Sequence, residues 1–388
     1  MLRNPLVISL VSILIVALGL FLALVVIDPF GVWPTKLSSG FFNPKAERIN
    51  TVRLGKAYDL LRNCPDDVIT GMSTVVWGID PDDYPRKGYS LYNGGIVGST
   101  MEEQYYYLKH YLNQCPNIGR IYLDLNAETF RERPPQRDFV PERLTEAVMY
   151  PPDLIFTSFS SSAILASART VTDAYTGRVN RMLYDSGNGF HFHPSKARDE
   201  DRYKSIVRFL TLDKTHSVIR VSKLQISYLR QLVHELKKRN IELVAFFGPI
   251  SQVLFAQAEQ REVLPVRPGE NMYFDIRRQI AEITSFWDFG LNNNITGDDI
   301  SHTKHFFDQI HYFPTTGTAV LAAVNGRKDP SLPDNFAVYV TQDNINDHIE
   351  RLKQGNIQWR QQFPHYYQMI SDHYGKLKVN EEIPNELF

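Results

Sequence analysis

The sequence predicts an α/β protein built on a mainly parallel sheet with helices on both faces. Short apolar runs typical of buried strands alternate with longer helix-like segments over much of the chain after residue 57. The length of 388 residues is enough for a full core in one large domain or two. Aromatic residues make up 12% and charged residues 22%, which is typical of a globular protein. A net charge of −1 without an extended basic run argues against nucleic acid as a partner.

The N-terminal segment 5–27 contains no charged residue and is almost entirely apolar. As a helix rising about 1.5 Å per residue, it can cross the roughly 30 Å hydrocarbon layer of a membrane. A cleaved signal peptide is the alternative, but this apolar core is longer than the usual stretch of about 7–15 residues, and Val-Val-Ile-Asp-Pro is a poor cleavage site. We therefore predict an uncleaved single-pass anchor at 1–28. Arg3 and the α-amino group precede it, which favours a cytoplasmic N-terminus and a periplasmic main domain.

A linker, 29–56, is followed by the first series of expected elements. These are a helix over 47–62, a strand over 68–73, a strand over 89–93, a helix over 100–113 and a strand over 120–125. Ser99, Thr100 and Glu102 supply capping groups where the helix over 100–113 begins.

The second series begins with an amphipathic helix over 222–239. Its apolar face consists of Leu224, Leu229, Leu232, Val233 and Leu236. A strand over 241–249, a helix over about 272–284 and a strand over 285–289 follow.

The two series are separated by residues 131–221, which interrupt the alternation. This stretch holds a Pro pair, an apolar segment over 153–169 and a run rich in Gly, His and Arg, and we interpret it as an inserted cap. The resulting division is an α/β domain over 57–330 that contains the cap, followed by a helical C-terminal tail over 331–388 with a helix near 343–354.

The two cysteines, Cys64 and Cys115, lie in similar contexts, each just before a strand-like run. If those strands are parallel neighbours, both cysteines lie at the same end of the sheet. A domain outside the cytoplasm is in an oxidising environment, so we predict a disulfide. Closing a loop of about 50 residues is worth at most roughly 4 kcal/mol by loop entropy. Two unpaired thiols are the alternative.

The first core strand ends in Gly71-Met72-Ser73-Thr74. Open α/β sheets bind ligands at the carboxyl ends of their strands, so Ser73 is a candidate nucleophile. A Ser that caps the following helix is the alternative.

Two further segments match a known pattern. The block Tyr92-Asn93-Gly94-Gly95-Ile96-Val97-Gly98-Ser99-Thr100 follows the second strand, and Asp308-Gln-Ile-His311 lies near the end of the domain with Gly317 after it. Together with Ser73, and in the same order, they resemble the SGNH (GDSL-like) hydrolases over roughly 66–130 and 240–325. The chain looks most similar to membrane-anchored SGNH-like proteins of cell-envelope polysaccharide systems, which include alginate O-acetylation and teichoic-acid D-alanylation factors. This resemblance implies a flavodoxin-like sheet.

The resemblance also implies catalytic roles. Ser73 would be the nucleophile, His311 the general base and Asp308 the group that orients the imidazole, because a serine hydroxyl needs a base to take its proton. The backbone N–H groups of Ser73 and Gly98 would form an oxyanion hole. The family's Gly-x-Asn-Asp block is absent, and Asn126 is the nearest replacement for its donor.

Other residues have competing interpretations. Asp308 and His311 could be a solvated ion pair. His302 and His305, with Asp298 and Asp299, have metal-ligand spacing, but their polar surroundings favour a solvated face, and we expect no metal and no cofactor. Three further sites each have two interpretations. The pair His191 and His193 could line the cap or ligate a metal, Asp288 could support the site or lie at the core edge, and Trp77 could pack a helix or stack on a sugar.

These features predict a membrane-anchored acyl esterase or O-acyltransferase that acts on a cell-envelope or exported polysaccharide. The alternative is an inactive scaffold that keeps the fold to bind a glycan or a membrane acyltransferase partner. The expected partners are therefore an acyl-ester or polysaccharide substrate and the membrane.

Overall fold

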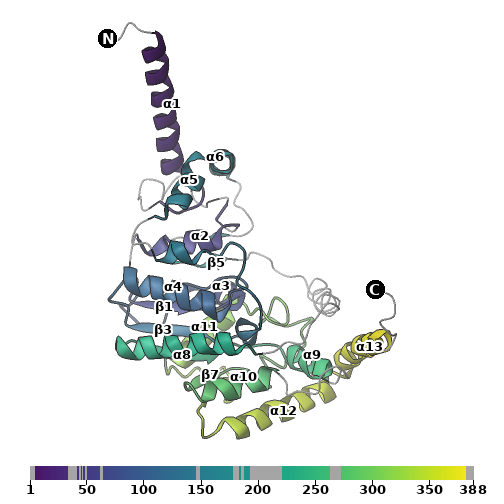
Figure 1. The fold of residues 1–388 in the computed structure, drawn as a ribbon. Helices are drawn as coiled ribbons and strands as arrows, with labels where there is room; N and C mark the ends of the chain where they lie inside the picture. The colour runs from purple at the N-terminus through teal and green to yellow at the C-terminus, as the bar shows by residue number, and fades with distance from the viewer. Residues whose placement is uncertain are drawn as a thin grey trace. The chain divides into compact units, whose positions relative to one another are not determined.

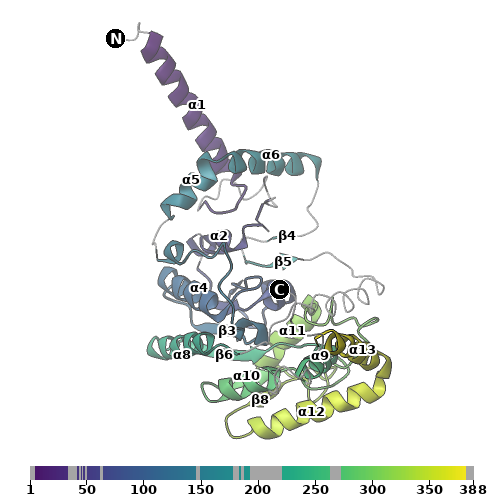
Figure 2. The same cartoon turned by 45° about the vertical axis from the view of Figure 1, so that its right-hand side comes forward.

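The computed structural model describes residues 5–33, 42, 45, 47–48, 50–61, 64–145, 149–177, 183–184, 188–192, 221–262 and 272–381 (Figures 1 and 2). The chain divides into two compact units. We call Met1–Pro65, Tyr106–Asn117 and Arg137–Pro194 the anchor unit. We call Asp66–Tyr105, Ile118–Gln136 and Ser195–Phe388 the sheet unit.

The sheet unit contains a six-stranded sheet in the order β2-β1-β3-β6-β7-β8. Its strands are β1 (Asp67–Thr70), β2 (Leu91–Asn93), β3 (Arg120–Asp124), β6 (Glu242–Phe247), β7 (Phe286–Asp288) and β8 (Val338–Val340). The first five pair in parallel in the doubly wound order, with Ile69 opposite Tyr122 and Tyr122 opposite Val244. The predicted α/β class with a mainly parallel sheet is therefore confirmed. The antiparallel edge strand β8 was not predicted.

Helices surround this sheet (Figure 2). They are α3 (Ser73–Gly78), α4 (Met101–Gln114, which continues into the anchor unit), α8 (Lys223–Lys238), α9 (Gln252–Glu262), α10 (Met272–Ala281), α11 (Pro314–Val324), α12 (Ile345–Gln362) and α13 (Pro364–Glu381), with the short 3₁₀ helices η2 (Pro81–Asp83) and η3 (Ala127–Phe130). The predicted face of α8 is buried at Leu229, Leu232, Val233 and Leu236, whereas Leu224 is exposed. Helices α9 and α11 were not predicted, whereas α12 and α13 lie in the tail over 331–388 that was predicted to be helical.

The core of the sheet unit also holds a buried ion cluster. The Arg277 guanidinium donates to both oxygens of Asp288, at 2.5 and 3.2 Å, and His348 Nε2 lies 3.0 Å from Asp288 Oδ2. Burial alone would raise the pKa of Asp288, but the charges of Arg277 and His348 hold it well below its usual value. Asp288 thus joins β7 to α10 and α12.

The anchor unit begins with α1 (Pro5–Ile27), an apolar helix on which Leu24 is the one buried residue. It is long enough and apolar enough to cross a membrane. The predicted apolar segment over 153–169 forms two helices, α5 (Pro151–Phe159) and α6 (Ser161–Thr176), which meet at a 56° bend. A short hairpin of β4 (Leu183–Tyr184) and β5 (His191–Phe192) follows, and most of the predicted cap after residue 192 lies outside the described residues.

The predicted helix over 47–62 is wrong in length. The segment forms only α2 (Val52–Lys56) and the 3₁₀ helix η1 (Asp59–Leu61). Arg48 is the physical reason, because its guanidinium is fully buried, donates to backbone carbonyls and pairs with Asp59. A Cβ at Gly55 would lie 1.2 Å from Arg48 Nη1, so the chain winds around this cation instead of continuing as a surface helix.

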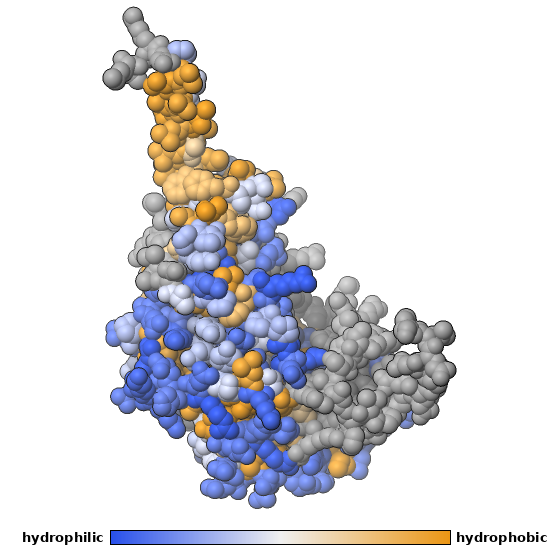
Figure 3. Space-filling model, viewed as in Figure 1, coloured by the Kyte–Doolittle hydropathy of each residue, from blue (hydrophilic) through white to orange (hydrophobic). Residues whose placement is uncertain are grey.

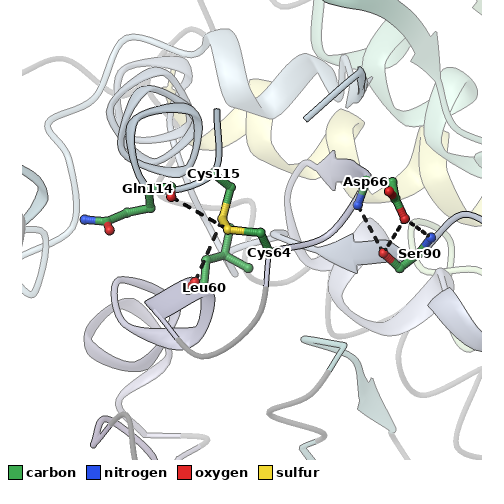
Figure 4. Close-up of a disulfide and its surroundings, with 6 residues drawn as sticks. All are labelled: Leu60, Cys64, Asp66, Ser90, Gln114 and Cys115. Carbon is green, nitrogen blue, oxygen red and sulfur yellow. Dashed lines mark hydrogen bonds between the residues drawn. A yellow bond between two sulfur atoms is a disulfide. The ribbon is translucent and has the colours of Figure 1, made fainter. Parts of the chain in front are cut away.

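The anchor unit contains a disulfide between Cys64 and Cys115, with their Cα atoms 5.4 Å apart (Figure 4). The cysteines precede β1 and β3, which pair with Asp67 opposite Arg120. Two neighbouring parallel strands therefore start next to this bond. The sulfur atoms also lie 3.7 and 3.9 Å from the carbonyl oxygens of Gln114 and Leu60.

Two glycines bring α3 and α11 into close contact in the sheet unit. A Cβ on Gly317 would lie 1.7 Å from the carbonyl oxygen of Gly78, and a Cβ on Gly78 would lie 2.3 Å from the Tyr312 ring. Neither position has room for a side chain. Since α3 begins at Ser73 and α11 follows His311, this contact sets the distance between the two segments.

We predict that Gly317→Ala lowers the free energy of unfolding by about 1–3 kcal/mol, because the methyl group forces the backbones of α3 and α11 apart. Chemical denaturation of the full chain in detergent measures this change. Gly119→Ala is the matched control, because a Cβ there meets nothing closer than 3.9 Å. Equal stability of the two variants would contradict the close-approach argument.

Candidate active site

Ser73 lies at the sharp turn between β1 and α3 and is the first residue of the helix. The residue in the capping position is Met72, so Ser73 does not cap α3 and the alternative interpretation of a capping serine is wrong. Gly71 permits the turn, because a Cβ there would lie 2.5 Å from Val75 Cγ2 and 2.7 Å from Asp124 Cβ. The half-buried Ser73 hydroxyl is therefore free of a capping role.

His311 and Asp308 lie on the loop before α11, which is closed by an antiparallel bridge between Phe306 and Tyr312. Asp308 Oδ1 accepts hydrogen bonds from the backbone N–H groups of Ile310 and His311, each at 2.8 Å. Asp308 Oδ2 lies 2.8 Å from His311 Nδ1. The spacing of three residues thus lets one carboxylate fix both the backbone and the ring of His311.

The structure brings this loop to Ser73. His311 Nε2 lies 2.7 Å from Ser73 Oγ. A carboxylate only accepts hydrogen bonds, so Nδ1 carries the ring proton and Nε2 accepts from the serine. This is the tautomer that a general base requires, and the three side chains form one continuous chain of hydrogen bonds.

The electrostatics of Asp308 suit its place in this chain. Burial acts to raise the pKa of the carboxyl, but the neighbouring His311 ring and the two backbone N–H donors outweigh it, and the net pKa is lowered. Asp308 therefore stays ionised. The side chains of His311 and Asp308 are 13% and 16% exposed, so the interpretation as a solvated surface ion pair is wrong.

The proposed oxyanion-hole residues lie at the ends of the strands next to β1. Gly98 occupies a left-handed turn after β2 with φ +62°, and its N–H makes no hydrogen bond to any described residue. Asn126 follows β3, and its Oδ1 accepts from the Glu128 N–H at 3.0 Å. The Asn126 oxygen is therefore committed to capping η3, and its amide nitrogen remains as a donor.

Asp124 is a residue of the site that sequence reasoning missed. It is 1% exposed at the end of β3, and its carboxyl accepts from the Thr74 hydroxyl at 2.5 Å and from the Gly248 N–H at 3.2 Å. One carboxyl thus ties together the segments that follow β1 and β6. Burial raises its pKa to about 6, and these two hydrogen bonds offset the effect in part. A charged residue closing an apolar strand run was the available signal.

A pocket opens beside the triad, between Thr74, which follows Ser73, and Ile310, which precedes His311. Its apolar wall consists of Phe247, Ile250, Leu254, Tyr273 and Ile310. Its polar lining consists of Thr74, Asp124, Asn126, Glu128 and Arg277.

The other residues considered as site candidates make packing or ion-pair contacts inside the protein. Asp288 belongs to the buried ion cluster, and the Trp77 ring packs on the His311 ring with a centroid distance of 4.6 Å. His191 lies buried on β5, where burial lowers its pKa, and His193 lies outside the described residues.

The histidines near Asp298 and Asp299 do not form a metal site with them in the described part of the chain. No group there of three or more His, Cys, Asp or Glu side chains is placed to hold an ion. Asp299 instead accepts from the Tyr366 hydroxyl at 2.6 Å.

Asp124 should make stability depend on pH. The folded carboxyl takes up its proton near pH 6, whereas an unfolded one does so near 3.8, so its contribution falls as the pH rises through this window. A shift of about two pKa units corresponds to roughly 3 kcal/mol. Between pH 4 and pH 7 the free energy of unfolding of Asp124→Asn should therefore rise by about 3 kcal/mol relative to that of the wild type, as measured by chemical denaturation. A difference in the free energy of unfolding that stays constant with pH would contradict this assignment.

Comparison of the chain with protein-family models and with curated proteins finds no match.

Proposed function

We propose that this chain is a membrane-anchored, extracytoplasmic serine esterase or O-acyltransferase of the SGNH type, acting on a cell-envelope or exported polysaccharide. The observation that carries the proposal is the hydrogen-bonded chain from Ser73 Oγ through His311 to Asp308, with distances of 2.7 and 2.8 Å. Ser73 and His311 come from segments 238 positions apart. The hydrogen bonds run from the serine hydroxyl to the imidazole and from the imidazole to the carboxylate, which is the direction that nucleophilic catalysis needs.

The geometry supports a two-step acyl transfer. Ser73 Oγ attacks the carbonyl carbon of an ester while His311 Nε2 takes the hydroxyl proton. The tetrahedral intermediate collapses, the alcohol leaves with the proton from His311, and an acyl-enzyme remains. Water or a sugar hydroxyl then gives its proton to His311 and attacks the acyl carbon. The bond to Ser73 Oγ breaks, Ser73 takes the proton back from His311, and an acid or a new ester is released. Asp308 stabilises the imidazolium in both steps.

The oxyanion needs donors at the position where its charge develops. The N–H groups of Ser73 and Gly98 and the amide of Asn126 are the candidates, at the ends of β1, β2 and β3. The Asn126 amide would take the place of the Asn in the missing Gly-x-Asn-Asp block.

The fold and the anchor support the family and the compartment. The parallel strand order β2-β1-β3-β6-β7 is the order of a flavodoxin-like sheet, as the resemblance to SGNH hydrolases implies. The disulfide favours an oxidising compartment, and α1 favours attachment to the cytoplasmic membrane. The class of substrate, a polysaccharide ester, comes from the resemblance. A membrane acyltransferase is a further candidate partner as an acyl donor.

A fluorophosphonate probe tests for the activated serine, because Ser73 displaces fluoride from phosphorus only when His311 removes its proton. The full chain in detergent should be labelled between pH 6 and pH 9, and Ser73→Ala should abolish the labelling. Asp308→Asn should slow it by as much as about 10⁴-fold, because the imidazole loses its tautomer and its counter-charge.

Ser227→Ala, on α8, is the matched control and should be labelled at the wild-type rate. Folded wild-type protein that stays unlabelled across the pH range would favour the scaffold that only binds a glycan or a membrane acyltransferase.

Asn126 gives a separate test of the oxyanion hole. Asn126→Ser keeps a side-chain oxygen for capping η3 but removes the amide donor. If this amide stabilises the oxyanion, hydrolysis of an activated acetyl ester should slow by about 10²–10³-fold. The melting temperature should stay near that of the wild type. An unchanged rate would assign Asn126 to capping alone.

A further inference from the structure

The α5–α6 elbow, which we define as Pro151–Thr176, turns large apolar side chains outward from the anchor unit. No charged residue occurs between positions 154 and 168. The exposed apolar side chains are Ile155 at 61%, Phe156 at 38%, Phe159 at 64%, Ile164 at 46% and Leu165 at 61%. A cluster of this kind is costly in water and typically marks an interaction surface.

The polar side of the elbow faces the protein interior instead. Its buried residues include Thr157, Ser158, Ser167 and Thr170. The hydroxyls of the last three have no hydrogen-bond partner within the part of the chain that the structure describes. A helix on a water-facing surface has the opposite orientation. The inward contacts that hold α5 are polar, because the buried Asp153 pairs with Arg143 and accepts from the Tyr58 hydroxyl at 2.6 Å. The large apolar side chains of the elbow are left on its outward side.

The apolar side is continuous with the membrane helix. The Phe159 ring stacks on Phe21 with centroids 5.5 Å apart, and Phe156 packs on Phe30 at 5.1 Å. Figures 1 and 2 show α5 and α6 beside the end of α1, and in Figure 3 the hydrophobic surface continues from α1 onto this region. Phe21 lies six residues before the end of α1, which is about 9 Å at 1.5 Å per residue. That depth matches the boundary between headgroups and acyl chains.

The elbow is not a straight second membrane span. Helices α5 and α6 together are long and apolar enough for a span, but they have 9 and 16 residues, each short of the roughly 20 that a straight span needs, and they meet at a 56° bend. The second half of α6 carries the exposed groups Arg169, which pairs with Glu47, and Tyr175. Such residues are favoured at the headgroup level.

We propose that the α5–α6 elbow inserts into the interfacial region of the bilayer leaflet where α1 ends, as a second membrane attachment. The elbow then fixes the orientation of the anchor unit, since a single helix alone leaves it free to rotate about the membrane normal. The inference depends on α1 crossing the bilayer and does not depend on catalysis by Ser73.

Single-cysteine labelling of the full chain in lipid nanodiscs tests this placement. Cys64 and Cys115 are joined in a disulfide, so an introduced thiol is the one that reacts with an environment-sensitive fluorophore. Phe159→Cys and Leu165→Cys should each give blue-shifted emission. Lipids that carry a spin label near the top of the acyl chain should quench both. Leu165→Cys should melt like the wild type because the replaced side chain is exposed, whereas Phe159→Cys also removes the ring contact with Phe21.

Two further positions calibrate the measurement. Val16→Cys, 70% exposed in α1, should be quenched as a residue of the span. Leu224→Cys on α8, whose leucine is 56% exposed, is the matched control and should be neither shifted nor quenched. Labels at 159 and 165 that behave like the label at 224 would overturn the proposal. A blue shift without lipid quenching would also overturn it, because a second copy or a protein partner would then cover the elbow.

Discussion

The hydrogen bond between Ser73 and His311 is the interaction on which the proposed function of this molecule depends. It joins residues 238 positions apart, so it exists only if the sheet, α3 and α11 are in their correct places. Two glycines with no room for a side chain set the approach of those helices, and Asp308 fixes the imidazole through its ring and its backbone. The close approach of the two helices and the hydrogen bonds of Asp308 together fix the position of the His311 ring relative to Ser73.

Two carboxyl groups of the same site have pKa values shifted in opposite directions. Asp308 has an imidazole and two backbone N–H donors, and its pKa is lowered. Asp124 is more deeply buried with a hydroxyl and a single N–H, and its pKa is raised to about 6. The difference follows from the number and charge of the donors. The first group is suited to stabilise an imidazolium, whereas the second acts as a structural tie between strand ends and is uncharged below about pH 6.

The anchor unit combines features that belong to a membrane surface. Its apolar helix α1, the outward apolar side of α5 and α6, and the aromatic contacts between them form one continuous hydrophobic surface. The unit also buries Arg48, whose guanidinium pairs with Asp59 and donates to backbone carbonyls. The proposed second attachment would place the apolar surface against lipid, while this cation is held inside the protein.

Local sequence signals determined much of this protein. The alternation of strands and helices, the apolar span at 5–27, the position of Ser73 at a strand end and the Asp308–His311 spacing were all predictable, because each depends on near neighbours in the chain. Tertiary structure decided the rest. Contacts between distant segments determine the short α2, the edge strand β8, the burial of Asp124 and the outward apolar side of α5 and α6. Residue periodicity shows that a helix has two sides, but only packing decides which side faces the protein.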